Sequence, residues 1–160
     1  MKLLVILSRV PYPLDKGDKL RAFNQIKQLS KKNEIILFAL DDRNIDEKKL
    51  VELKKYCASI TIFKLSKFTI LANIIRAFFN GNPLQVGYFY SRKAQKKVDD
   101  LILQHYPDHI YCQLIRTAEY AKQYSNIPKT LDYMDVFSKG MERRKSTESL
   151  SSVFNTSLIC

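Results

Sequence analysis

The residues best suited to binding chemistry lie in one loop and the turn that follows it, at positions 9–21. Lys16, Lys19 and Arg21 surround a single glycine, Gly17, in this stretch. A glycine lets the backbone approach a ligand closely, and cationic side chains beside a helix start favour phosphate. The pattern predicts a phosphate-binding turn, and an ordinary strand-to-helix turn explains it equally well.

Other chemical motifs are absent from the sequence. Neither GxGxxG nor GxxxxGK[ST] occurs, which argues against a dinucleotide-dependent oxidoreductase and against a nucleoside triphosphatase. His105 and His109 flank Pro107 and have no accompanying set of Asp, Glu or Cys, so no metal site is expected. The three cysteines are scattered without CxxC spacing, which argues against a disulfide framework and fits a reducing cytosol.

Alternating strand and helix patterns must position the loop. Segments with the composition of buried strands are residues 3–7, 35–40, 59–65, 109–113 and 129–133. Helical patterns separate them, at residues 19–32, 46–56, 66–79, 91–104 and 117–124. Asp18 is expected to cap the first helix, and Leu20 to face inward from it. Such alternation predicts an α/β fold, a Rossmann-like parallel sheet with helices on both faces.

Length and charge limit the function classes. The 160 residues suit one domain, and 27 Lys+Arg against 16 Asp+Glu give a formal net charge of +11. A basic surface points to acidic partners, namely phosphates, nucleic acid or anionic lipid. The apolar N-terminal run is short and interrupted by Arg9, so it is expected to be a strand and not a signal peptide, and no segment is expected to cross a membrane.

A long zone without acidic residues, at positions 53–98, contains an apolar stretch at 68–79. Basic and apolar side chains together suit contact with an anionic membrane surface. The residues expected to make that contact are Lys67, Arg76, Phe78, Phe79, Arg92 and Lys93. The alternative, slightly favoured by the pattern alone, is a buried core helix surrounded by solvated lysines. Aromatics at 88–90 could stack on bases, but nucleic acid is an unlikely partner because no recognisable module surrounds them.

Four blocks resemble a known family. RVPYPLDKGDKLRAF (9–23), GNPLQVGYFYS (81–91), LIRTAEY (114–120) and DYMDVFSKGMERR (132–144) occur in order. They are similar to bacterial glycosyltransferases of the group 1, or family 4, type, and most of all to the branch of exopolysaccharide sugar transferases. The resemblance covers residues 1–144.

The resemblance implies the N-terminal, acceptor-side half of a GT-B fold, in which a second Rossmann-like domain holds most of the nucleotide-sugar site. It places Gly17 near the donor diphosphate, and Arg116 and Asp135 facing the cleft, with Asp135 as a proton acceptor. With the loop analysis it gives the expected substrate-binding residues: Lys16, Gly17, Asp18, Lys19, Arg21, Arg116 and Asp132. Alternatives are an ion pair of Arg116 with Glu119, and helix capping by Asp132 or Asp135.

Residues 145–160 are rich in Ser and Thr and depart from the family pattern, so we expect a tail of a truncated or frameshifted product that is inactive alone. The implied donor is a nucleoside diphosphate sugar, and the implied acceptor is a saccharide or a lipid-linked group, with no cofactor or metal. The expected location is the cytoplasm, with peripheral contact at the inner face of the membrane. The alternative is a non-catalytic basic module that binds anions or a membrane surface.

Overall fold

Five parallel strands form a single sheet in the computed structural model, which describes residues 1–41, 50–66 and 88–133. The strands are β1 (Lys2–Leu7), β2 (Glu34–Asp41), β3 (Ser59–Lys64), β4 (His109–Gln113) and β5 (Lys129–Asp132). Their order in the sheet is β3-β2-β1-β4-β5, and every neighbouring pair is parallel. This order places β1 at the centre, where Leu4 lies opposite Ile36 on one side and Ile110 on the other.

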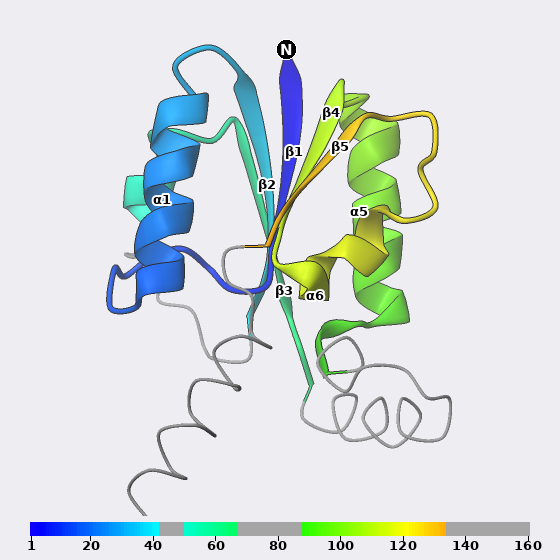
Figure 1. Ribbon diagram of the computed structural model, residues 1–160, viewed down its shortest axis with the longest axis horizontal. Coiled ribbons are helices and arrows are strands. Elements are labelled where there is room, and N and C mark those ends of the chain that lie inside the picture. The colour runs from blue at the N-terminus through cyan, green and yellow to red at the C-terminus, as the bar shows by residue number, and fades with distance from the viewer. Residues whose placement is uncertain (42–49, 67–87, 134–160) are drawn as a thin grey trace, which may run out of the picture.

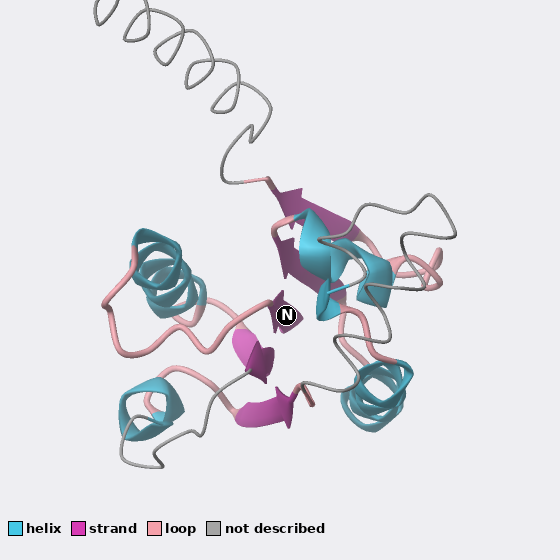
Figure 2. Cartoon of the chain, turned by 90° about the horizontal axis from the view of Figure 1, so that it is seen from below, coloured by secondary structure: helices cyan, strands magenta, loops and turns pink. Residues whose placement is uncertain are grey.

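Helices cover both faces of the sheet, as Figures 1 and 2 show. On one face lie α1 (Gly17–Leu29) and α2 (Leu50–Lys54). The other face carries α5 (Arg92–His105), α6 (Ile115–Ala118) and a short 3-10 helix, η2 (Glu119–Ala121). The predicted Rossmann-like α/β class is confirmed.

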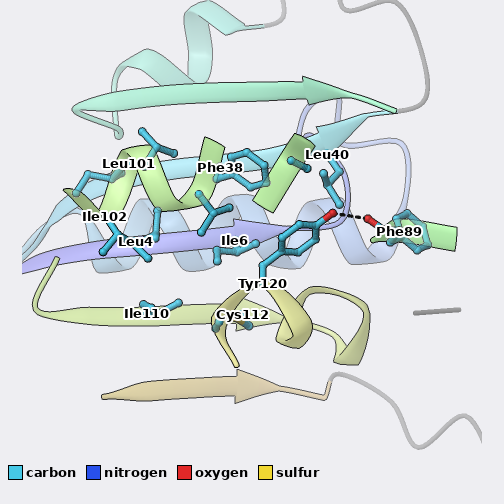
Figure 3. Packing of buried hydrophobic residues seen from close by; sticks show 14 of the residues in the cluster. Leu4, Ile6, Phe38, Leu40, Phe89, Leu101, Ile102, Ile110, Cys112 and Tyr120 are labelled. Atoms are coloured by element: carbon cyan, nitrogen blue, oxygen red, sulfur yellow. Dashed lines mark hydrogen bonds between the residues drawn. The ribbon is translucent and has the colours of Figure 1, made fainter. Parts of the chain in front are cut away.

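Two buried clusters, one on each face of the sheet, explain why the sequences of the central strands are continuously apolar. Leu3 and Val5 face α1 and pack with Phe23 and Ile26, whereas Leu4 and its even-numbered neighbours face α5. Successive side chains of a strand point to opposite faces, so both faces of β1 must be apolar when helices cover both. Figure 3 shows the second cluster, where side chains of β1, β2 and β4 meet α5.

A fully buried tyrosine links α5 to η2 on this face. The hydroxyl of Tyr120 donates to the carbonyl oxygen of Phe89 at 2.6 Å and accepts from the backbone N–H of Ser91 at 2.9 Å. Figure 3 shows the first of these bonds. The amide of Gln95 also donates to the carbonyl oxygen of Tyr120, at 3.2 Å. These contacts fix the segment that leads into α5, including the ring of Phe89.

The start of α1 differs from the prediction. The helix begins at Gly17, and the capping position belongs to Lys16, whose backbone is extended (φ −138°, ψ 149°) and whose side chain caps nothing. Asp18 lies inside the first turn and pairs with Arg9 instead, so its predicted role as N-cap is wrong. Leu20 is 45% exposed and does not face inward, because the buried face of the helix is formed by Ala22, Phe23 and Ile26.

Several expectations fall on residues outside the described ranges. They include the start of the helix expected at 46–56, the helix at 66–79 and the tail at 145–160. Where the helix 117–124 was expected, α6 begins two residues earlier and passes into η2. A search of the described helices finds none long and apolar enough to span a bilayer.

The two described cysteines, Cys57 and Cys112, are free and buried. Burial raises the pKa of each thiol to about 12. A thiol with such a pKa is almost entirely protonated at neutral pH, and only the thiolate is a strong nucleophile. Both side chains therefore serve as packing groups in the core.

Candidate functional site at the carboxyl edge of the sheet

The candidate site lies where β1 and β4 send their chains to opposite faces of the sheet. The chain after β1 turns toward α1, and the chain after β4 enters α6 on the other face, so the segments diverge at one edge (Figure 1). Ligands of open parallel sheets bind in the crevice outside the carboxyl ends of the strands at such a point. Residues 14–17 of the loop are exposed there. The predicted loop therefore lies at the edge expected for a ligand.

Arg9 lies two residues after the end of β1 and is the first cation of the candidate site. Its Nη1 atom lies 3.4 Å from Oδ2 of Asp18, and the two side chains keep 37% and 25% of their surface exposed. The amide of Gln113, the last residue of β4, reaches the carbonyl oxygen of Asp18 at 3.5 Å. The contact links the end of β4 to the start of α1.

Arg116, in α6, is the second cation. Its guanidinium lies over the ring of Phe89, 5.1 Å from the ring centroid, which is the geometry of a cation–π contact. The predicted alternative, a pair with Glu119, does not form, because Glu119 pairs with Lys122 at 3.3 Å. No carboxylate forms an ion pair with Arg116 in the part of the chain that the structure describes.

Burial and two charged neighbours act on the pKa of Arg116. Burial lowers the pKa of Arg116, and the positive charge of Arg9 lowers it further, while the charge of Asp18 opposes both effects. The guanidinium stays charged at neutral pH, because an arginine begins from a very high pKa. Both Arg9 and Asp18 therefore influence the charge of Arg116.

The backbone that leads into α6 is strained. Leu114 has φ 68° and ψ 150°, a conformation that L-residues other than glycine rarely adopt. Its N–H donates to the carbonyl oxygen of Asp132 at 2.8 Å, and Thr117 donates to the carbonyl oxygens of Gln113 and Leu114. Surrounding hydrogen bonds thus hold a costly turn that sets the position of Arg116. Strain of this kind concentrates at functional sites.

Two of the predicted loop residues, Lys16 and Gly17, are exposed at the same edge. Lys19 pairs with Asp15 at 2.8 Å, and Lys16 is exposed. A Cβ atom placed on Gly17 would meet no heavy atom within 4 Å, so folding does not require a glycine here. This open space is compatible with the predicted approach of a ligand.

Arg21 and Asp132 form a separate cluster on the α1 face. Both carboxylate oxygens of Asp132 accept from Nη2 of Arg21 at 3.0 Å, and Oδ2 also accepts from Gln25 at 2.9 Å and from Tyr111 at 2.8 Å. Only 13% of the Asp132 side chain is exposed. Burial and the nearby carboxylate raise the pKa of Tyr111, so the phenol stays protonated and donates. The cluster joins α1 to β4 and β5, which gives these two predicted site residues a structural role.

The remaining predicted residues divide into two groups. Arg92 and Lys93 are exposed at the start of α5, at the same edge of the sheet (Figure 1). Outside the described residues lie Lys67, Arg76, Phe78, Phe79 and Asp135. Sequence reasoning missed Arg9 and Phe89 as members of the site, although Arg9 occurs in the first block of the resemblance.

Metal-binding potential is low in the described part of the chain. Within those ranges no group of three His, Cys, Asp or Glu side chains could hold a metal ion. His109 instead shares a hydrogen bond of 2.9 Å with the hydroxyl of Thr130 on the neighbouring strand.

Comparison with solved structures supports the fold. No protein-family model matches the chain, and no curated protein matches it. Among solved structures, the chain is similar to UGT2 of Phytolacca americana, solved in complex with UDP-2fluoro-glucose and pterostilbene, with a TM-score of 0.51 and 13% identity. The match covers 82% of this chain and 30% of that chain, so this chain spans less than a third of that protein. The likeness supports the fold: a Rossmann-like unit of the kind found in GT-B glycosyltransferases.

Proposed function

We propose that this chain is the acceptor-side domain of a nucleotide-sugar-dependent glycosyltransferase of the group 1 type, which builds cell-surface polysaccharide. The observation that carries the proposal is the pair of guanidinium groups, Arg9 and Arg116, at the switch point of a Rossmann-like sheet. Arginine is the side chain that best matches the geometry of phosphate oxygens. The likeness to a structure that contains UDP-2fluoro-glucose supports the same proposal.

In this proposal the arginines stabilise the leaving diphosphate. The bond between the sugar's anomeric carbon and the diphosphate oxygen breaks, the acceptor hydroxyl oxygen bonds to that carbon, and negative charge grows on the diphosphate. Cations already fixed in place stabilise such charge most effectively. Phe89 and the strained turn at Leu114 fix Arg116 before the ligand arrives. Asp135 is the proposed acceptor of the hydroxyl proton, and a second domain would supply most of the donor site.

The predicted loop completes the proposed anion site. Lys16 and Lys19 add positive charge beside the arginines, and the open space at Gly17 admits a phosphate group. The negative charge of Asp18 offsets the positive charge of Arg9. Arg21 and Asp132 hold α1 in place beside this loop.

The decisive test is binding and transfer of nucleoside diphosphate sugars. A panel of these donors is titrated into the chain and into a version extended with a second Rossmann-like domain, and transfer to saccharide and lipid-linked acceptors is measured with the extended version. We expect the extended version to bind a donor and transfer its sugar. If neither protein binds any nucleoside diphosphate sugar, the glycosyltransferase function is wrong.

The variant Gly17→Ala distinguishes the effect of this position on ligand binding from its effect on stability. We expect the variant to be as stable as the wild type or up to about 1 kcal/mol more stable, because alanine favours a helix and nothing lies near the new methyl group. We also expect weaker binding of UDP, because the methyl group occupies space that the phosphate would use. Thermal unfolding and calorimetric titration measure the two effects. Unchanged affinity would remove Gly17 from the site.

A second candidate function is contact with an anionic membrane surface. Arg92, Lys93, Lys96 and Lys97 are all exposed on the first turns of α5, and no acidic residue lies in its first turn. About 1 kcal/mol of attraction to an anionic surface is expected for each such residue. Together with Lys67, Arg76, Phe78 and Phe79, they would hold the protein at the inner face of the membrane in the cytoplasm.

Sedimentation with vesicles tests this contact. We expect the chain to sediment with phosphatidylserine-containing vesicles at low salt and to remain in solution at high salt, since salt screens exposed charges. Replacing Arg92, Lys93, Lys96 and Lys97 by Gln should abolish sedimentation. The control replaces Lys31 and Lys32, exposed beyond the far end of α1. Equal sedimentation of both variants would contradict a role for α5.

A further inference from the structure

Asp18 has an unusual position among the charged residues of the site. Its carboxylate caps no backbone N–H of α1, and it forms an ion pair with Arg9. At 3.4 Å the contact is longer than the 2.7–2.9 Å of a strong charge-assisted hydrogen bond. Both side chains remain partly open to water. An ion pair of this kind contributes little to stability and breaks readily.

The charges around it do not balance. Arg9 lies 3.4 Å from Asp18, and Gln113, three residues before Arg116, contacts the backbone of Asp18, so the start of α1 has two guanidinium groups and one carboxylate around it. Arg116 has no carboxylate partner within the described ranges, and Phe89 holds it in place from one side. A single carboxylate that pairs with Arg9 leaves the second guanidinium available. A phosphate or diphosphate group has enough oxygens to bind both.

We propose that Asp18 is a resident counterion, which occupies Arg9 until a phosphate-bearing ligand displaces it and bridges Arg9 and Arg116. Only the side chain needs to move, because Gln113 reaches the backbone carbonyl oxygen of Asp18 and α1 continues beyond it. The carboxylate competes with the ligand for the same guanidinium and repels its oxygens. Asp18 thereby lowers the affinity for anions and selects ligands with enough charge to displace it. The inference rests on the proposed placement of the anion in this crevice.

The test is a calorimetric titration of inorganic pyrophosphate into the chain at low ionic strength. Asp18→Asn keeps the size of the side chain and removes its charge. We expect this variant to bind pyrophosphate about threefold to tenfold more tightly than the wild type, the range set by loss of a weak ion pair and of a nearby repulsion. Titration of UDP should give the same ratio if the diphosphate is the recognised group, whereas an effect confined to pyrophosphate would point to the free anion.

The control is Asp100→Asn, which changes the net charge equally but lies on the exposed face of α5, where it pairs with Lys97. Its affinity should equal that of the wild type. In an Arg9→Gln background, Asp18→Asn should have almost no effect, because the partner is absent. Thermal unfolding of each variant checks the fold, and Asp18→Ser provides a second removal of the charge.

The outcomes separate the two proposals. If binding requires Arg9 and Arg116 but neither Asp18 variant binds more tightly, the counterion role is wrong and the anion site stands. If neither the wild type nor the Asp18 variants bind pyrophosphate or UDP, the crevice is not an anion site. Both the counterion role and the proposed placement of the diphosphate are then wrong.

Discussion

Replacing Asp132 by Ala should lower the free energy of unfolding by about 3 kcal/mol. The variant leaves the hydroxyl of Tyr111, the amide of Gln25 and the guanidinium of Arg21 without their shared acceptor. An unsatisfied buried donor costs about 1–3 kcal/mol, and removing one partner of a buried ion pair costs about 3–5 kcal/mol. Arg21 is half exposed and water can solvate it, so the total lies near the lower limit. Urea unfolding measures the change.

Two further variants assign this loss to the cluster. Tyr111→Phe removes one donor and no charge, so it should cost only about 1 kcal/mol. Asp100→Ala removes an exposed carboxylate from α5 and should cost less than about 0.5 kcal/mol. A loss at Asp132 no larger than that at Asp100 would show that the cluster does not join α1 to the sheet in solution.

The strands were predictable from the sequence because burial on both faces leaves a local signal. Lys2–Leu7 and Glu34–Asp41 contain runs of apolar residues, as a covered parallel strand requires, and their predicted limits differ from the structure by at most one residue at each end. The shorter α6 and η2 were placed less well. Their geometry depends on the turn at Leu114 and on the bonds of Tyr120, which join residues far apart in the sequence.

The candidate site was predictable only in its location. A glycine among cations after the first strand indicates the carboxyl edge, since the topology of a parallel sheet fixes where that edge lies. Arg9 pairs with Asp18, whereas Arg21 reaches Asp132 on β5. The second pair joins residues 111 positions apart, so it depends on the packing of α1 against the sheet and leaves no local signal in the sequence.

The contact between Arg116 and Phe89 could not be inferred from the sequence. Phe89 precedes it by 27 positions and meets it only because Tyr120 fixes the backbone of residues 89 and 91. An arginine held over a ring loses little freedom when it binds a ligand. This contact is the strongest reason to expect a large effect at Arg116.

Replacing Arg116 by Gln should weaken the binding of pyrophosphate and of UDP at least about tenfold. The guanidinium is already fixed and partly desolvated, and a charge-assisted, bidentate contact to phosphate is among the strong hydrogen bonds of proteins. Loss of the cation–π contact alone should cost only about 0.5–1 kcal/mol of stability, so the variant should remain folded. Calorimetric titration measures the affinity, and thermal unfolding verifies the fold.

Two further variants, Arg116→Lys and Lys32→Gln, test whether the loss of affinity is specific to the guanidinium group of Arg116. Lysine keeps the charge but loses the planar fork and much of the stacking on Phe89, so its affinity should fall between those of the wild type and of Arg116→Gln. Lys32 is exposed beyond the far end of α1, and its removal should leave affinity unchanged apart from a small general effect of net charge. Equal weakening by Arg116→Gln and Lys32→Gln would mean that pyrophosphate binds to the overall positive charge of the protein. The proposed crevice between β1 and β4 would then have no role in recognising the diphosphate.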